Sequence, residues 1–204
     1  CTEPGSTFKL VSMIVAMDAG LVDTSDIIDI EEGKWQHYEQ TIFDSDYGEH
    51  HIREISVKEI FERSSNVGMA KIITSAYKGR EREFIDRIYN MGLNKPLGMG
   101  FKGEANPYIK YPNDPDWWGT SLAWMSYGYE SKLSPLQILT FYNAVANDGK
   151  MVKPMVVEAI RKDGRTLQSF DTEVMKSAIC SRETVKKAQA LLMGVVENGT
   201  AKQL

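Results

Sequence analysis

The sequence predicts a helix-rich α/β fold, and three of its features support this prediction. Several segments with helical apolar periodicity are bounded by residues that typically begin or end helices. Segment 10–17 is apolar on nearly every side, which is typical of a helix at the centre of a domain. Only short runs alternate between apolar and polar residues, so we expect few and small strands.

Length, charge and cysteine content narrow the class of protein. The 204 residues are enough for one large domain with a substantial core. The net charge of −4 leaves no basic stripe to replace the counterions of a nucleic acid, so no nucleic-acid partner is expected. Cys1 and Cys180 are too few for a disulfide framework or a metal cluster, and no cofactor is expected.

The elements can be placed in chain order. Residues 6–19 should form one helix that ends at Gly20. The alternating runs 27–30 and 40–43 are expected to pair with each other as small strands. A capping box at 56–59 should begin a helix that is broken at 64–66, and further helices are expected at 67–77 and 80–91. A surface loop should follow at 94–115. The last expected elements are a helix at 136–146 after Ser134-Pro135, a hairpin at 151–170 and a helix from 182 to about 197.

Ser6 and Lys9 are the first catalytic candidates, because residues three apart share one face of a helix. A serine hydroxyl is a weak nucleophile until a base removes its proton. A lysine can be that base when burial keeps it neutral, and a helix N-terminus favours a developing oxyanion. The alternative is a helix-capping serine beside a surface lysine. The same spacing recurs at Ser75 and Lys78, where the serine lies at the end of a helix without free N–H groups.

Ser64 and Asn66 form the second candidate pair, in the break between two expected helices. A hydroxyl can pass a proton to a leaving group, and a carboxamide can hold a substrate amide through its donor and acceptor groups. Serine and asparagine are also common where helices break, so a purely structural turn is the alternative.

Together these motifs resemble the class B penicillin-binding proteins. Ser-x-x-Lys followed by Ser-x-Asn is the signature of active-site serine enzymes that recognise penicillin. The resemblance covers the whole chain and is greatest for the septal, cell-division type. The segments that carry it are 3–9, 63–68, 126–130, 134–137, 143–150 and 197–202.

The resemblance implies a role for each candidate. Ser6 would attack the carbonyl of a terminal D-Ala-D-Ala in a peptidoglycan stem peptide and form an acyl-enzyme, while Lys9 accepts the proton of Ser6. Ser64 would relay a proton to the departing D-Ala nitrogen, and Asn66 would hold the substrate amide. β-Lactams would acylate Ser6 as mimics of the stem-peptide terminus. No metal or other cofactor is implied.

The resemblance also implies the setting of the protein. The parent would act at the extracytoplasmic face of the bacterial cytoplasmic membrane, anchored by an N-terminal helix. Cell-division membrane proteins are its candidate partners.

One motif of the family is absent from the sequence. Lys-Thr-Gly, which in the family closely follows the segment at 197–202 on an inner strand, occurs nowhere. We therefore expect 1–204 to be part of a β-lactamase/transpeptidase-like domain, truncated before this motif. It would be mostly the helical lobe, with most of the central sheet missing. Apolar faces should then be exposed on 10–17 and 182–197, and activity should be impaired.

Other polar and aromatic residues suggest weaker hypotheses. His50-His51 lies beside Asp44 and other acids, but adjacent side chains point in different directions, so a polar surface loop is favoured over a metal site. Trp117-Trp118 and Trp124 could line a binding groove or serve as core and loop anchors. Cys180 is expected to be a small buried residue.

Two other functions stay open. Serine β-lactamases and β-lactam sensors share the first two motifs, but a β-lactamase needs an additional base for deacylation. No glutamate can be assigned to that role by spacing. A non-catalytic helical module that binds a partner would owe its motifs to chance. Acylation of Ser6 by labelled penicillin, and the lifetime of the acyl-enzyme, would separate these functions.

Overall fold

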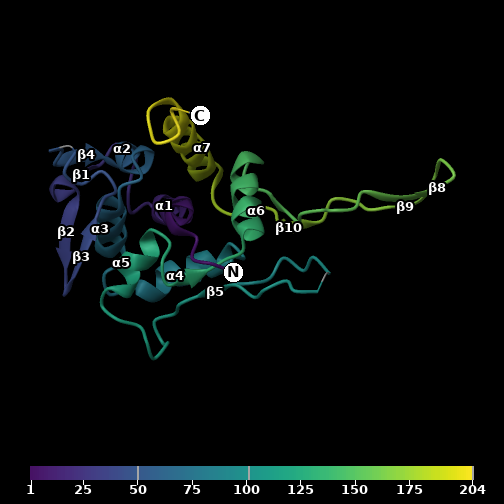
Figure 1. Ribbon diagram of the computed structural model, residues 1–204, viewed down its shortest axis with the longest axis horizontal. Coiled ribbons are helices and arrows are strands. Elements are labelled where there is room, and N and C mark those ends of the chain that lie inside the picture. Colours follow the sequence, from purple (N-terminus) through teal and green to yellow (C-terminus); the bar gives the residue numbers. More distant parts are fainter. Residues whose placement is uncertain (50, 101, 204) are drawn as a thin grey trace.

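The computed structural model describes residues 1–49, 51–100 and 102–203. Helices and small antiparallel sheets alternate along these residues, which confirms the predicted α/β class (Figure 1). The helices are the 3₁₀-helices η1 (Gly5–Phe8) and η2 (Glu31–Gly33) and the α-helices α1 (Lys9–Asp18), α2 (Val57–Glu62), α3 (Asn66–Tyr77), α4 (Glu81–Asn90), α5 (Ser121–Ser126), α6 (Pro135–Ala146) and α7 (Arg182–Glu197).

The strands form two-stranded sheets, and no larger sheet occurs within the described residues. The pairs are β1 (Ile27–Asp29) with β4 (Glu54–Ser56), β2 (Lys34–His37) with β3 (Gln40–Phe43), β5 (Tyr108–Ile109) with β6 (Ser131–Lys132), β7 (Met151–Val152) with β10 (Val174–Lys176), and β8 (Ala159–Lys162) with β9 (Arg165–Ser169). The expected pairing of 27–30 with 40–43 is wrong, because β2 and β3 are joined by the tight turn at Tyr38-Glu39 and pair with each other.

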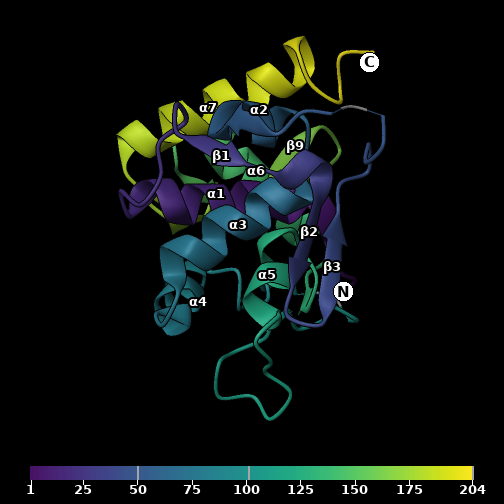
Figure 2. The same ribbon diagram turned by 90° about the vertical axis from the view of Figure 1, so that its left-hand side faces the viewer.

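Helix α1 lies at the centre of the core, surrounded by other helices (Figure 2). All residues from Lys9 to Met17 are buried, and α1 packs against α3, α4 and α7. The expectation of an exposed apolar face on 10–17 is therefore wrong. Helix α7 buries Leu191 but leaves Met193 and Val196 more than half exposed, so apolar surface remains there.

The expected helix caps are confirmed. Ser56 Oγ accepts a hydrogen bond from Glu59 N at 3.2 Å, while Glu59 Oε2 accepts one from Ser56 N at 2.9 Å. Ser134 begins α6 with a second capping box, and Ser181 caps α7. These caps satisfy backbone N–H groups that have no partner inside the helix.

The hairpin expected at 151–170 also forms, as β8 and β9 around Asp163-Gly164. It projects away from the helical body (Figure 1). No helix in the described ranges has the length and apolar character needed to cross a membrane.

Candidate active site

Lys9 and Ser64 meet in the structure although 55 residues separate them in sequence. The Lys9 Nζ atom donates to Ser64 Oγ at 2.9 Å and to the Ser64 carbonyl oxygen at 2.5 Å. The first residue of α1 and the turn before α3 therefore share one site. One residue of each candidate pair, Lys9 and Ser64, therefore lies in this contact.

The environment of Lys9 favours the neutral form of its side chain. Its side chain is almost completely buried, with 2% of the residue exposed. Burial disfavours the charged form and lowers the pKa of Lys9 from 10.5 to about 8, although the nearby Asp44 carboxylate opposes this shift. With that pKa, roughly a tenth of the lysine is neutral at pH 7 and can accept a proton.

Ser6 lies one turn before Lys9, on η1 rather than at the N-cap of an α-helix. The helix expected over 6–19 is present up to Asp18, but its first turn is the 3₁₀-helix η1 and the α-helix begins only at Lys9. Gly5, with a positive φ of 58°, begins this turn. The Ser6 side chain is exposed, and no hydrogen bond to its hydroxyl occurs in the described part of the chain. The distance from Ser6 Oγ to its expected partners stays a prediction.

Contacts from two distant elements hold the η1 turn in place. Gly5 N donates to the Gly128 carbonyl at 3.1 Å, and the Tyr142 hydroxyl donates to the Thr7 carbonyl at 3.0 Å. A Cβ atom on Gly128 would lie 2.0 Å from the Gly5 carbonyl oxygen, so only glycine allows this approach. Gly128 belongs to the segment 126–130, and its role is to support the turn that carries Ser6.

Ser64 adopts a backbone conformation that is uncommon for a serine. Its φ is 58°, in the left-handed region. Ser64 N donates to Phe61 O at 3.1 Å, and Ser65 N donates to Ile60 O at 2.9 Å, which closes the end of α2. The bond from Lys9 to the Ser64 carbonyl fixes the same turn. A strained residue held by its surroundings is typical of functional sites.

Asp44 also holds the turn that precedes α3. Its carboxylate accepts from Ser65 Oγ at 2.7 Å and from Val67 N at 2.9 Å, at the start of α3. Asp44 is 6% exposed, so the expected polar surface loop is wrong at this position. The role of Asp44 at this turn was not expected from the sequence. The available signal was a single aspartate directly after the alternating run 40–43.

Asn66 is the first residue of α3 and is held by the end of β3. Its Nδ2 atom donates to the Phe43 carbonyl oxygen at 2.9 Å. This bond uses one N–H group, and within the described residues the carboxamide oxygen and the second N–H group have no partner. The end of β3 therefore positions both Asn66 and, through Asp44, the turn that contains Ser64.

The other candidate residues that the structure describes lie outside this group of contacts. His50 lies outside the described residues, and the exposed His51 pairs with Glu32 at 3.2 Å. Burial raises the pKa of the Cys180 thiol to about 12, which is expected of an unreactive cysteine. Trp124 packs against the Tyr127 and Tyr129 rings.

Comparison with known proteins places the chain in a family. The family model "Penicillin binding protein transpeptidase domain" matches residues 1–204. Penicillin-binding protein PbpB of Mycobacterium tuberculosis is 28% identical over 96% of this chain, which covers 27% of that protein. Peptidoglycan D,D-transpeptidase FtsI of Buchnera aphidicola is 27% identical over 99% of this chain and 35% of that protein.

Solved structures show the same fold. Penicillin-binding protein 3 of Mycobacterium tuberculosis, crystallised with aztreonam, is 25% identical with a TM-score of 0.75, over 95% of this chain and 41% of that chain. The D,D-transpeptidase domain from Eggerthella lenta has a TM-score of 0.82 at 20% identity, over 97% of this chain and 49% of that chain. The chain spans about a third or less of the curated relatives named above. The family match, the fold and the paired motifs agree that this chain belongs to the penicillin-binding protein transpeptidase domain family.

Proposed function

We propose that the chain carries the acylation machinery of a serine-type peptidoglycan D,D-transpeptidase. The observation that carries the proposal is the contact between Lys9 and Ser64, in which a buried lysine of lowered pKa donates to a second serine. Membership of the penicillin-binding protein transpeptidase family supports it. The substrate would be a peptidoglycan stem peptide that ends in D-Ala-D-Ala.

In the first step, neutral Lys9 accepts the hydroxyl proton of Ser6. The freed electron pair on Ser6 Oγ forms a bond to the carbonyl carbon of the penultimate D-Ala, and the carbonyl oxygen becomes an oxyanion. Lys9 is then an ammonium group. Its low exposure keeps water from competing for the proton, which is the physical reason for burying this base.

In the second step, the oxyanion re-forms the carbonyl double bond and the carbon–nitrogen bond to the terminal D-Ala breaks. Its electron pair goes to the nitrogen, which takes the Ser64 hydroxyl proton, and Lys9 returns a proton to Ser64 Oγ across the 2.9 Å contact. The products are acyl-Ser6 and free D-Ala, with Lys9 neutral again. The free carboxamide oxygen of Asn66 would accept a hydrogen bond from a substrate amide.

In the third step, an amine of a second stem peptide attacks the acyl carbon. The amine loses a proton along the same relay, and the electron pair of the broken ester bond returns to Ser6 Oγ, which is reprotonated. A β-lactam would follow the first two steps, in which the C–N bond of its own ring breaks, but its leaving nitrogen stays tethered to the acyl group and obstructs the third step. The structure of penicillin-binding protein 3 with ampicillin concerns a relative of this chain.

The setting of the reaction is also proposed. Since the chain spans 27–35% of the curated relatives named above and contains no Lys-Thr-Gly, we place that motif in another part of the parent protein. Residues 1–204 would then be the helical part of the transpeptidase domain, impaired on their own. The parent would act outside the cytoplasmic membrane, held by an N-terminal anchor, with division proteins as partners.

The test is a turnover assay with the parent protein. A stem pentapeptide donor and an amine acceptor should give free D-Ala and a cross-linked product by mass spectrometry. Ser6→Ala should give neither. A cross-linked product from Ser6→Ala at the wild-type rate would contradict the proposal. Rapid turnover of penicillin without any cross-linked product would instead favour a β-lactamase.

A further inference from the structure

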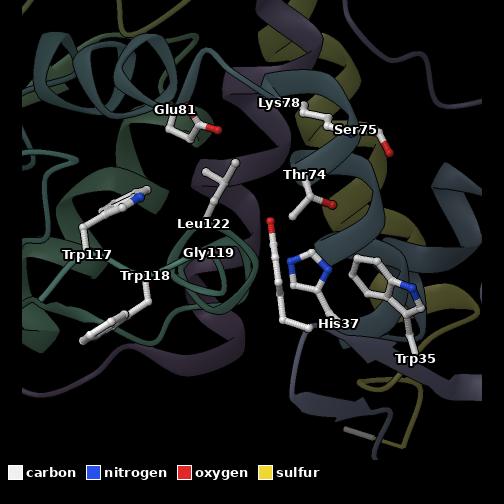
Figure 3. A pocket seen from close by; sticks show the side chains of 11 residues that line it. Trp35, His37, Thr74, Ser75, Lys78, Glu81, Trp117, Trp118, Gly119 and Leu122 are labelled. Carbon is white, nitrogen blue, oxygen red and sulfur yellow. The ribbon is translucent and has the colours of Figure 1, made fainter.

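A pocket of about 400 Å³ lies away from the candidate active site, between the β2–β3 hairpin, the end of α3 and the loop before α5. This volume falls in the range of roughly 300–1,000 Å³ that is typical of small-molecule sites. Trp117 and Trp118 stand on one side of the opening, and Trp35 and His37 stand on the other (Figure 3).

The aromatic side chains of the pocket present uncovered ring surface. Trp118 is 66% exposed and Tyr38 is 69% exposed, which is high for residues of this size. A Cβ atom on Gly119 would lie 2.9 Å from Tyr38 Cζ, so the Tyr38 ring rests directly on the Gly119 backbone. The loop before α5 therefore supports the tip of the hairpin, and large aromatic faces are left open to a ligand.

Polar side chains, including one of each charge, also line the edge of this pocket. Ser75 and Lys78, the second serine–lysine pair of the sequence, lie on its wall together with Glu81. In the described part of the chain, no hydrogen bond or ion pair uses the Ser75 hydroxyl or the Lys78 ammonium group. Glu81 Oε1 accepts from Gly79 N at 2.9 Å, which leaves Glu81 Oε2 available.

This combination selects the chemistry of the ligand. Flat aromatic faces favour a ring with an apolar C–H face, and the mixed edge favours hydroxyl and amide groups around that ring. A purely apolar ligand would desolvate Lys78 and Glu81 without replacing their hydrogen bonds. We propose that this pocket binds an N-acetylated amino sugar of the peptidoglycan glycan strand.

The position of the pocket relative to the candidate active site fits this ligand, and this part of the inference rests on the proposed function. Helix α3 begins with Asn66 and reaches Ser75 nine residues later, which corresponds to about 14 Å along its axis. A stem peptide of about five residues spans at most ~17 Å when extended. The helix rise between Asn66 and Ser75, which lines the pocket, is therefore within the reach of one extended stem peptide.

The binding test uses tri-N-acetylchitotriose as the probe and the full-length parent protein. Saturation-transfer NMR and quenching of tryptophan fluorescence should report binding to the wild type. Trp118→Ala should weaken binding about tenfold, because a stacking face is lost at an exposed position that contributes little to folding. Lys78→Met should also weaken it. The matched control Phe170→Ala removes an aromatic residue with 40% exposure on the β8–β9 hairpin, and it should bind like the wild type.

Three results would overturn the inference. The first is no binding of the trisaccharide by a wild-type protein that still acylates with penicillin, a result that leaves the proposed function intact. The second is equal binding by wild type, Trp118→Ala and Lys78→Met. The third is that Trp118→Ala loses affinity only for a sugar-free stem peptide, which would make the pocket a peptide site.

The link to Ser6 has its own readout. Trp118→Ala should raise KM for stem peptides joined to a disaccharide while leaving kcat unchanged. With sugar-free stem peptides, its KM should equal that of the wild type. Trisaccharide binding that depends on Trp118 in a protein that never acylates would support the sugar site and refute the proposed function. An equal KM change with both substrates would refute the link.

Discussion

Lys9 Nζ lies 2.9 Å from Ser64 Oγ, and this contact joins the start of the core helix to the turn between α2 and α3. The pair has two consequences. It places a base of lowered pKa beside a hydroxyl that can relay a proton. It also holds Ser64 in a left-handed conformation, because the same ammonium group binds the Ser64 carbonyl.

The rate of acylation should follow the protonation state of Lys9. With a pKa of about 8, the neutral fraction rises roughly tenfold between pH 6 and 7 and levels off above pH 9. Stopped-flow measurement of penicillin acylation in the parent protein should therefore give a rate that rises with pH to a plateau. A rate constant that does not change between pH 6 and 9 would show that Lys9 is not the base.

The free energy of unfolding should also depend on pH through the protonation of Lys9. The unfolded chain keeps the Lys9 proton up to a pKa of about 10.5, whereas the folded chain releases it near the lowered pKa of about 8. Between these values the unfolded state binds more protons, so the free energy of unfolding rises with pH. Below pH 8 the folded state carries the full free-energy cost of burying a charged Lys9, and this cost is lost as the pH rises to 10.5.

Lys9→Met isolates this contribution, because it removes the titrating group. The unfolding free energy of the variant minus that of wild type should fall by about 3 kcal/mol between pH 8 and 10.5. Denaturant titrations at several pH values measure this difference. Parallel curves for the two proteins would mean that the pKa of Lys9 is not lowered by folding.

Asp44→Asn should alter the site through two separate effects. The carboxylate accepts from Ser65 Oγ and Val67 N, and an amide can accept only one of these bonds well, so we expect a loss of about 1–3 kcal/mol in stability. Removing the charge should also lower the pKa of Lys9 further, which moves the acylation profile to lower pH.

Asp46→Asn is the matched control for this variant. Asp46 pairs with Arg63 at 2.6 Å, and both side chains are about one-third exposed. Its loss should cost less than about 1 kcal/mol and should leave the pH profile in place. Equal profiles for wild type and Asp44→Asn would refute the electrostatic role of Asp44.

Gly128→Ala should displace the turn that carries Ser6. The new Cβ would lie 2.0 Å from the Gly5 carbonyl oxygen, where the neighbouring backbone has to move. Thermal unfolding should show a large destabilisation, and penicillin acylation should slow more than stability alone explains. Gly79→Ala tests the backbone conformation alone, because Gly79 also has a positive φ but open space around its Cβ position. If Gly128→Ala and Gly79→Ala lost the same stability and the same acylation rate, the close approach of Gly5 and Gly128 would not be the cause of the effect.

Local chemistry was predictable from the sequence, and distant contacts were not. The caps at Ser56, Ser134 and Ser181 are set by residues within one turn, so the sequence located those helix starts correctly. Helix α5 was missed, because it is one to two turns long and its N-cap residue Thr120 makes no side-chain cap bond.

The same difference between local patterns and distant contacts applies to the candidate site. Ser6, Lys9, Ser64 and Asn66 became candidates because each belongs to a short motif of defined spacing, and the structure brings Lys9 and Ser64 into contact. The structure adds Asp44, which acts across a distance of 23 residues on Val67 N. Such support depends on which elements pack together, and the pattern of a single sequence does not contain that information. The strand pairing failed for this reason as well.

Ser6 is the proposed nucleophile of the acyl-transfer site. The most direct measurement is incubation of the parent protein with a penicillin, followed by proteolysis and mass spectrometry of the modified peptide. We expect one penicilloyl group on Ser6 and no adduct in Ser6→Ala, while Ser169→Ala on the distant hairpin labels like the wild type. A penicilloyl adduct that persists in folded Ser6→Ala, or that maps to another residue in the wild type, would show that Ser6 is not the nucleophile.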